Sequence, residues 1–328
     1  MQSNSKADLL ARVLNSTGYF RGKVRLADLL GRLACSWNDG RGTFPLTNGK
    51  TVTIDLNDRI QRLMWGAAYE PDVRRCLSAL LRPGDTFVDV GSHIGFFSLI
   101  ASSLVGCTGK VYAFEADSAL FEKLRANASE YAWLVVSLRA VWRESGSVSF
   151  SNPQQAGESG WGKLAFVRNE GHIASVEAVS LDEWHESVGC APVRLIKIDA
   201  EGSEPFILES ARRIIASARP FLIVELNDQL LREVGRPKEI VASALRDQGY
   251  RIFAMGSGDL IESDDLSDLS SPEILCVPSD RLEETERALP RLRTGAMPNA
   301  SATRHGVLAL SCHSAPPGPH VSQANLMK

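Results

Sequence analysis

Short apolar runs alternate with longer amphipathic stretches from residue 86 onward. The runs have the length of buried strands and are bounded by turn-forming or charged residues. They cover 86–90, 110–115, 133–139, 194–199, 221–226, 250–255 and 273–278. The amphipathic stretches predict helices at 96–104, 118–129, 204–217 and 238–248. This alternation predicts an α/β fold with a mostly parallel, seven-stranded sheet covered by helices on both faces.

The N-terminal 57 residues follow a different pattern. Apolar residues recur at helical spacing in 9–14 and again in 24–33. Asn48-Gly49 interrupts the alternating segment 43–56 and predicts a β-hairpin. Beyond residue 57, further helices are expected at 59–65 and 73–81. We therefore predict a helical and hairpin lead-in at 1–57, whose role, packing on the main domain or forming a homodimer contact, the pattern leaves open.

An insertion at about 143–180 breaks the alternation of the main domain, which we place at 58–290. Segments 147–150, 163–168 and 173–179 have the pattern of short antiparallel strands. The polar, Gly-rich loop between the first two contains Trp161, and we interpret it as a lid or substrate loop. Residues 294–328 are rich in Ala, Ser and Pro and have no acidic residue, which predicts a disordered tail.

Composition narrows the class of protein. The chain is 44% hydrophobic and 23% charged, with a formal net charge of -3, so it offers no general attraction to nucleic acid or to an anionic membrane. Its six Cys are scattered without a Cys-x-x-Cys pair, which favours reduced thiols and gives no sign of a metal site. No signal peptide and no apolar run of membrane-spanning length is apparent, and we expect a cytoplasmic protein.

The loop after the first strand of the sheet predicts a cofactor site. Gly91 and Gly95 lie between that strand and the following helix, at the end of an open α/β sheet where nucleotides bind. Asp89 beside them is unfavourable for a pyrophosphate but attracts the sulfonium and ammonium of S-adenosylmethionine. Glu115 ends the next strand, where a carboxylate can accept hydrogen bonds from both hydroxyls of a ribose. The pattern favours S-adenosylmethionine, with NAD as the alternative.

The end of the fourth strand contains candidate residues for acid–base catalysis. Lys197, Asp199 and Glu201 alternate there and point to one side if the strand continues. Glu225 ends the fifth strand and is expected in the same crevice. Coupled groups of this kind are candidates for acid–base work, although Lys197 and Asp199 could instead form an ion pair that closes the sheet edge.

Taken together, these segments resemble the FkbM family of S-adenosylmethionine-dependent methyltransferases. The matching pieces are Tyr69-Glu70-Pro71, GDTFVDVGSHIGFFSL (84–99), VYAFEAD (111–117), Leu124, Asn127, VSLDEW (179–184), LIKIDAEGSE (195–204) and 220–225. The resemblance implies a class I methyltransferase (Rossmann-like) fold. It also implies O-methylation of a hydroxyl on a sugar, a glycolipid or a polyketide-type natural product.

Two departures from the family pattern affect the cofactor loop. Ser92-His93 stands where the family usually has Ala-Asn, and Ala116 stands where it usually has Pro. The first change places an imidazole beside the cofactor. The cofactor-binding residues that we expect are Glu70, Asp89, Gly91, Ser92, His93, Gly95, Glu115 and Ala116.

Methyl transfer to a hydroxyl requires a group that accepts its proton. We expect Asp199 to be this base, and the further candidates are Glu201, Glu225 and Glu70.

Lys197 is expected to hold a carboxylate in its ionised form. Trp161 and Trp184 are candidates for stacking on a sugar ring, although either could instead anchor the core. An RNA ribose or a protein as acceptor, an NAD-dependent oxidoreductase and a non-catalytic binding protein stay open as alternatives.

Overall fold

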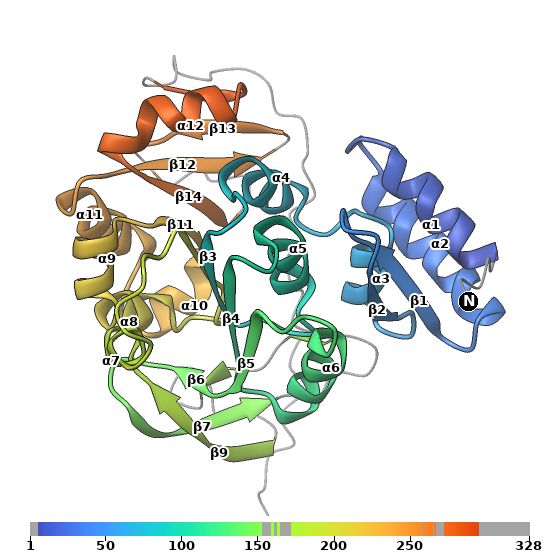
Figure 1. The fold of residues 1–328 in the computed structure, drawn as a ribbon, viewed down its shortest axis with the longest axis horizontal. Helices are drawn as coiled ribbons and strands as arrows, with labels where there is room; N and C mark the ends of the chain where they lie inside the picture. The colour runs from blue at the N-terminus through green and yellow to red at the C-terminus, as the bar shows by residue number, and fades with distance from the viewer. Residues whose placement is uncertain are drawn as a thin grey trace, which may run out of the picture. The chain divides into compact units, whose positions relative to one another are not determined.

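A nine-stranded sheet forms the centre of the main domain in the computed structural model, which describes residues 6–152, 159–160, 163–164, 172–256, 258–264, 266 and 272–294. The strand order is β15-β13-β12-β14-β11-β10-β3-β4-β5 (Figure 1). The strands are β3 (Thr86–Val90), β4 (Lys110–Glu115), β5 (Leu134–Leu138), β10 (Leu195–Ile198), β11 (Phe221–Glu225), β12 (Tyr250–Gly256), β13 (Asp259–Glu262), β14 (Glu273–Pro278) and β15 (Leu292–Arg293).

The five strands from β5 to β11 pair in parallel, and β14 is antiparallel to both β11 and β12. From β3 the chain proceeds to β4 and β5 on one side, and it later returns to β10 on the other side. Strands β3 and β10 therefore flank the switch point of the sheet, where ligands of open α/β sheets bind at the carboxyl ends of the strands.

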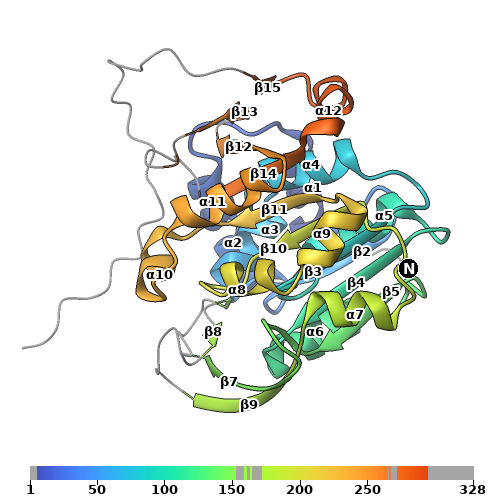
Figure 2. The same ribbon diagram turned by 90° about the vertical axis from the view of Figure 1, so that its left-hand side faces the viewer.

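Helices cover both faces of this sheet (Figures 1 and 2). Alternate strand residues enter two separate cores: Phe87 and Leu195 join one, and Val88 and Ile196 join the other. The first core includes residues of α4 (Pro71–Leu80), α5 (Phe96–Val105) and α6 (Ser118–Ala128). The second includes residues of α7 (Leu181–Ser187), α8 (Glu204–Glu209), α9 (Arg212–Ala218) and α11 (Lys238–Asp247). The predicted α/β class and its two-sided helical cover are confirmed.

The lead-in contains the predicted helices and hairpin. Its elements are α1 (Lys6–Ser16), α2 (Lys23–Trp37), β1 (Arg41–Pro45) and β2 (Thr51–Asp55). The predicted helix α3 (Arg59–Trp65) follows it. The ring of Phe44 in β1 packs edge-on against Phe96 of α5, with 4.9 Å between the ring centroids. The domain boundaries at 57 and 294 stay predictions.

The insertion forms a four-stranded sheet of order β6-β9-β7-β8. Its strands are β6 (Ala140–Val141), β7 (Gly146–Asn152), β8 (Lys163–Leu164) and β9 (His172–Val179). The strand predicted at 163–168 is observed over Lys163–Leu164, and its remainder lies outside the described residues. Trp161 and the tail beyond residue 294 also lie outside them.

Two expectations need correction, and three short helices had not been expected. The sheet has nine strands rather than seven, because the short strands β13 and β15 extend its edge. The helix predicted at 204–217 is two helices, because the Asp182 carboxylate accepts hydrogen bonds from the backbone N–H groups of Arg213 and Ile214 and so caps a new helix. The short helices α7, α10 (Asp228–Glu233) and α12 (Leu282–Ala288) were not predicted.

Candidate functional site

The Gly loop after β3 lies directly against the acidic end of β10. Asp89 is paired in register with Lys197, and the backbone N–H of Asp199 donates to the Val90 carbonyl at 3.1 Å. Gly91 has a φ of 78°, and a Cβ there would lie 1.7 Å from the Asp199 carbonyl oxygen. Only glycine fits this approach, so the predicted cofactor loop and the predicted catalytic strand end meet.

Asp89 is buried with one unused acceptor. Its side chain is 1% exposed, and its Oδ2 accepts a hydrogen bond from Ser98 Oγ at 2.5 Å. Its Oδ1 is buried and has no hydrogen-bond partner among the described residues. Burial raises the pKa of this carboxyl. An unpaired buried acceptor is costly, so the position favours a ligand that brings a cation or an N–H donor.

Ser92 and Gly95 shape the loop rather than point out of it. The Ser92 hydroxyl lies 2.8 Å from the Asp89 carbonyl and 3.1 Å from the Phe114 carbonyl. Gly95 has a φ of 85°, and a Cβ there would lie 2.6 Å from Leu124 Cδ1 of α6. Both residues therefore contribute to the cofactor loop through its backbone.

Glu115 receives backbone N–H groups at the end of β4. Its Oε2 accepts from His93 at 2.7 Å and its Oε1 from Asp117 at 2.8 Å. Burial raises the pKa of Glu115 to about 7. The backbone N–H of Ala116 is a third donor to this carboxylate. An ionised carboxylate has about four acceptor positions, so about one stays free for a ribose hydroxyl. Ala116 beside it packs on the small apolar cluster of the insertion.

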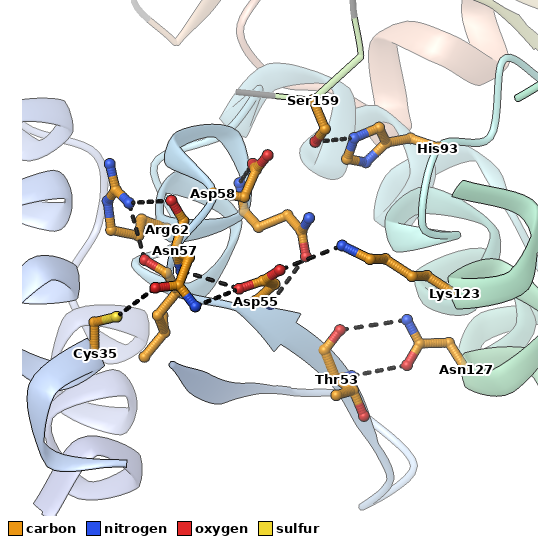
Figure 3. Close-up of polar contacts among 12 residues, drawn as sticks. Cys35, Thr53, Asp55, Asn57, Asp58, Arg62, His93, Lys123, Asn127 and Ser159 are labelled. Carbon is orange, nitrogen blue, oxygen red and sulfur yellow. Dashed lines mark hydrogen bonds and ion pairs between the residues drawn. The ribbon is translucent and has the colours of Figure 1, made fainter. Parts of the chain in front are cut away.

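His93 joins the cofactor loop to the insertion. Its Nε2 lies 2.6 Å from Ser159 Oγ, as Figure 3 shows, and its buried Nδ1 has no partner among the described residues. Burial lowers the pKa of His93 to about 4, although Asp58 and Asp199 oppose this effect. The imidazole is therefore neutral at neutral pH.

Lys197 and Asp199 form a buried ion pair. Lys197 is 3% exposed, its Nζ donates to Asp199 Oδ2 at 2.7 Å, and it lies 5.0 Å from the centroid of the Phe97 ring. Burial opposes the charge of Lys197, but Asp199, Glu70 and Asp89 raise its pKa above the usual value. Burial likewise opposes ionisation of Asp199, but Lys197 lowers its pKa. The pair is therefore ionised at neutral pH.

Two further carboxylates converge on Asp199. One oxygen each of Asp199, Glu201 and Glu225 lies within 4.8 Å of the others, a spacing that could hold a metal ion. Burial and the Asp199 charge raise the pKa of Glu225 well above its usual value, and the hydrogen bond between the two side chains lowers the pKa of Asp199. Lys197 thus already supplies counter-charge to this cluster. The sequence pattern had indicated no metal ligands.

Glu70 reaches the same site from the N-terminal end of α4. It has a left-handed backbone with a φ of 37°, and its buried Oε2 has no partner among the described residues. Burial raises the pKa of Glu70 to about 8, while Lys197 lowers it. Tyr69 stacks on Phe97, with 5.8 Å between the centroids. The charges of Glu70, Asp89 and Asp199 thus act on Lys197, and that of Asp199 acts on Glu225. The roles of these residues stay predictions.

Glu204 has a role that the sequence analysis missed. It is 1% exposed, and its carboxylate accepts hydrogen bonds from the backbone N–H groups of Ala200 at 2.8 Å and Gly202 at 3.0 Å. It therefore fixes the turn that carries Glu201, whose φ is 48°. The sequence analysis included Glu204 only as the last residue of the matching segment LIKIDAEGSE (195–204).

Asn127 of α6 is a second residue whose structural role the sequence analysis missed. Its Nδ2 donates to the Ile94 carbonyl of the Gly loop at 3.0 Å. It also faces Thr53 of β2 (Figure 3): its Oδ1 accepts from the Thr53 N–H at 3.0 Å, and its Nδ2 donates to the Thr53 carbonyl at 3.3 Å. One amide thus connects the hairpin, the cofactor loop and α6. Among the sequence signals, only the family resemblance pointed to this residue.

Trp184 lies in the core and not in a substrate cleft. It is 6% exposed, and its ring packs edge-on against Tyr112 at 4.8 Å and Phe114 at 5.6 Å between centroids. No free ring face is left for a sugar, so the core-anchor alternative describes this residue.

A family model described as "Methyltransferase FkbM domain" matches residues 89–252, which is half of the chain. The matched span contains the Gly loop, the acidic end of β10 and Glu225. Among curated proteins, none matches the chain by sequence.

Solved structures of methyltransferases are also similar to the chain. An FkbM methyltransferase from Methylobacillus flagellatus KT has 18% identity and a TM-score of 0.36, and the match covers 66% of this chain and 53% of that one. An S-adenosylmethionine-dependent O-methyltransferase from Thermotoga maritima has 14% identity and a TM-score of 0.36, with 74% and 80% covered. Fibrillarin from Aeropyrum pernix, solved with bound S-adenosyl-L-methionine, has 12% identity and a TM-score of 0.34, with 63% and 73% covered.

The chain thus matches about half the length of the first of these proteins.

Proposed function

Because the chain belongs to the FkbM family of methyltransferases, we propose that it transfers a methyl group from S-adenosylmethionine to a hydroxyl of a sugar, a glycolipid or a polyketide-type natural product. The observation that carries this proposal is the buried Lys197–Asp199 pair, whose backbone touches the Gly91 loop. Family membership leaves the NAD-dependent oxidoreductase without support.

The residues present fit this cofactor. The unpaired Oδ1 of Asp89 is a suitable acceptor for an ammonium group, and the remaining acceptor position of Glu115 suits a ribose hydroxyl. When bound, S-adenosylmethionine supplies an electrophilic methyl group on a sulfonium. His93, Gly91 and Gly95 then position the cofactor through the loop that they form.

Asp199 is the base in this proposal. The hydroxyl proton becomes strongly acidic as its oxygen gains a methyl group. A carboxylate of low pKa can therefore accept this proton, provided that the carboxylate is ionised. Lys197 favours this ionisation, and the hydrogen bond with Glu225 lowers the pKa of Asp199 further. Asp199 also orients the hydroxyl for in-line attack, because its oxygen accepts the hydrogen bond. Glu201 and Glu70 are the remaining carboxylates that can contact an acceptor.

The Asp199→Asn variant tests the base. We expect turnover to fall on the order of 10²- to 10⁴-fold, because the amide cannot accept the proton. Turnover is measured as transfer of an isotopically labelled methyl group from S-adenosylmethionine to a panel of reducing sugars, glycolipids and macrolactones. Binding of S-adenosylhomocysteine, measured by calorimetry, is expected to stay unchanged. Asp247→Asn, at an exposed position of α11, is the matched control.

Two results would contradict the proposal. Full turnover of Asp199→Asn with unchanged cofactor binding would remove Asp199 from the mechanism. Labelling of RNA or protein, with no hydroxyl of the panel labelled, would show that the acceptor class is wrong even if the base is right.

A further inference from the structure

The paired helices α1 and α2 expose an apolar face. They contact one another and lie side by side in Figure 1. Large apolar side chains recur four residues apart on each helix and are between 45% and 67% exposed: Leu9, Val13, Leu29, Leu33 and Trp37. We call these five residues, together with the exposed Arg12, Arg21, Arg25 and Arg32, the outer face. Tyr19 and Phe20, in the connection between the helices, are also exposed, at 53% and 41%.

The opposite sides of the two helices already supply the packing that the fold needs. Ala7, Ala11 and Leu14 of α1 and Ala27 and Ala34 of α2 are buried. Small inner residues let the helices approach the hairpin and α3 closely. The outer face is therefore not required for the packing of the described chain, and its large side chains need another explanation.

The exposed charges of residues 6–41 are mostly basic. Among the described residues of this segment, six basic side chains are exposed, against one acidic side chain, Asp39. The exposed basic residues are Lys6, Arg12, Arg21, Arg25, Arg32 and Arg41. The other two acidic residues are half-buried. Asp28 pairs with Arg62 at 2.7 Å and with Arg32 at 3.1 Å, and Asp8 accepts from Thr43 Oγ1 at 2.9 Å.

We propose that the outer face docks on the surface of an anionic lipid bilayer, with both helices parallel to it. Apolar side chains enter the boundary between headgroups and acyl chains, while arginines extend to the anionic headgroups. Trp37 and Tyr19 combine an apolar ring with a polar tip, as residues at that boundary do. Among the described residues no helix is long and apolar enough to cross the bilayer, so this contact is peripheral.

Charge decides against the other occupants of this face. A second copy bound by two-fold symmetry would bring the exposed arginines of one face against those of the other, which is repulsive. The C-terminal segment 295–328 has no acidic residue, so it offers no charge complementary to the face. An anionic lipid surface supplies both the negative charge and the apolar boundary.

Vesicle co-sedimentation of the full chain tests the proposal. The two vesicle types are phosphatidylcholine alone and phosphatidylcholine mixed with phosphatidylglycerol. We expect binding to the mixed vesicles that weakens with added salt. The variant Arg12→Gln with Arg25→Gln is expected to bind roughly 25-fold more weakly, at about fivefold per arginine. Leu29→Ser with Leu33→Ser is expected to lose on the order of tenfold or more.

Matched controls separate the face from general surface effects. Arg212→Gln and Ile240→Ser change exposed residues outside the lead-in and are expected to bind like the unchanged protein. Circular dichroism and S-adenosylhomocysteine binding are expected to stay unchanged in every variant, because none of these residues lies in the site.

Three outcomes overturn the proposal. In the first, mixed vesicles bind no protein, or bind the leucine and arginine variants as well as the unchanged chain. In the second, the protein is a dimer in solution that Leu29→Ser with Leu33→Ser dissociates, which assigns the face to a second copy. In the third, single-stranded RNA binds and vesicles do not. None of these results depends on which hydroxyl the enzyme methylates.

Discussion

Asp89 and Glu115 lie at the ends of neighbouring strands, and burial leaves them in different states. Asp89 has one unpaired oxygen, whereas both oxygens of Glu115 are already hydrogen-bonded to backbone N–H groups. Their positions could be predicted, because a carboxylate at a strand end beside a Gly loop follows from the chain order alone. Their hydrogen-bond partners could not, because these depend on the loop conformation around His93.

Cofactor affinity is expected to depend on the ionisation of Glu115. Its pKa is about 7 in the folded protein, and ribose hydroxyls donate best to the ionised form. The dissociation constant for S-adenosylhomocysteine should therefore rise as pH falls below about 7. Glu115→Gln should bind roughly 10- to 100-fold more weakly at pH 8 and should lose most of this pH dependence.

Calorimetry between pH 5.5 and 8.5 measures both effects. Glu144→Gln, at an exposed position, is the control. Because Glu70 and Glu204 also have raised pKa values, a pH dependence that persists in Glu115→Gln would assign the titration to one of them.

Gly91→Ala is expected to destabilise the protein far more than Gly49→Ala. Both glycines have a positive φ, near 80°, but only at Gly91 would the new Cβ overlap a backbone oxygen. Gly49→Ala should cost about 1 to 2 kcal/mol from backbone strain alone. Gly91→Ala should cost roughly 3 to 5 kcal/mol, because the strands must also move apart. Denaturant unfolding measures both, and equal losses would refute the close contact with Asp199.

At the scale of elements, local patterns predicted strands β3 and β4 to the residue, because each is a short apolar run with a turn at both ends. The break between α8 and α9 could not be predicted in this way. It depends on Asp182, which is some thirty residues away in sequence and caps α9 from another helix. The edge strands β13 and β15 were missed for a related reason, since such short strands are defined by their pairing partners rather than by their own pattern.

Asn127→Ala is expected to loosen the hairpin and the cofactor loop together. Its amide bonds to the Thr53 backbone and to the Ile94 carbonyl would be lost, at a cost of roughly 1 to 3 kcal/mol. Thermal unfolding should shift to lower temperature, and S-adenosylhomocysteine binding should weaken. Asn127→Asp keeps the acceptor for the Thr53 N–H but loses the donor to the Ile94 and Thr53 carbonyls, so it should retain part of the hairpin contact and still weaken binding. If both variants bind normally, the amide does not support the loop.

At the scale of the whole molecule, the combination of motifs predicted the family, but the net charge of the chain concealed a surface that is locally basic. Residues 6–41 contain seven basic and three acidic side chains within a chain of formal charge -3. The average predicted no attraction to anionic surfaces, whereas the structure turns Asp8 and Asp28 inward, so six exposed basic residues face one exposed acidic residue, Asp39. The acceptor could not be predicted at any scale, because the side chains that select it come from segments far apart in sequence.

The bridge from Asn127 to Thr53 has a consequence for how the chain is made. The hairpin and the amide that secures it are separated by 74 residues. At a synthesis rate of about 5 to 20 residues per second, the ribosome needs about 4 to 15 s to supply that partner. An isolated two-stranded hairpin is at best marginally stable in water. During each round of translation, strands β1 and β2 therefore emerge before their support exists, and in that interval they are available to chaperones and proteases.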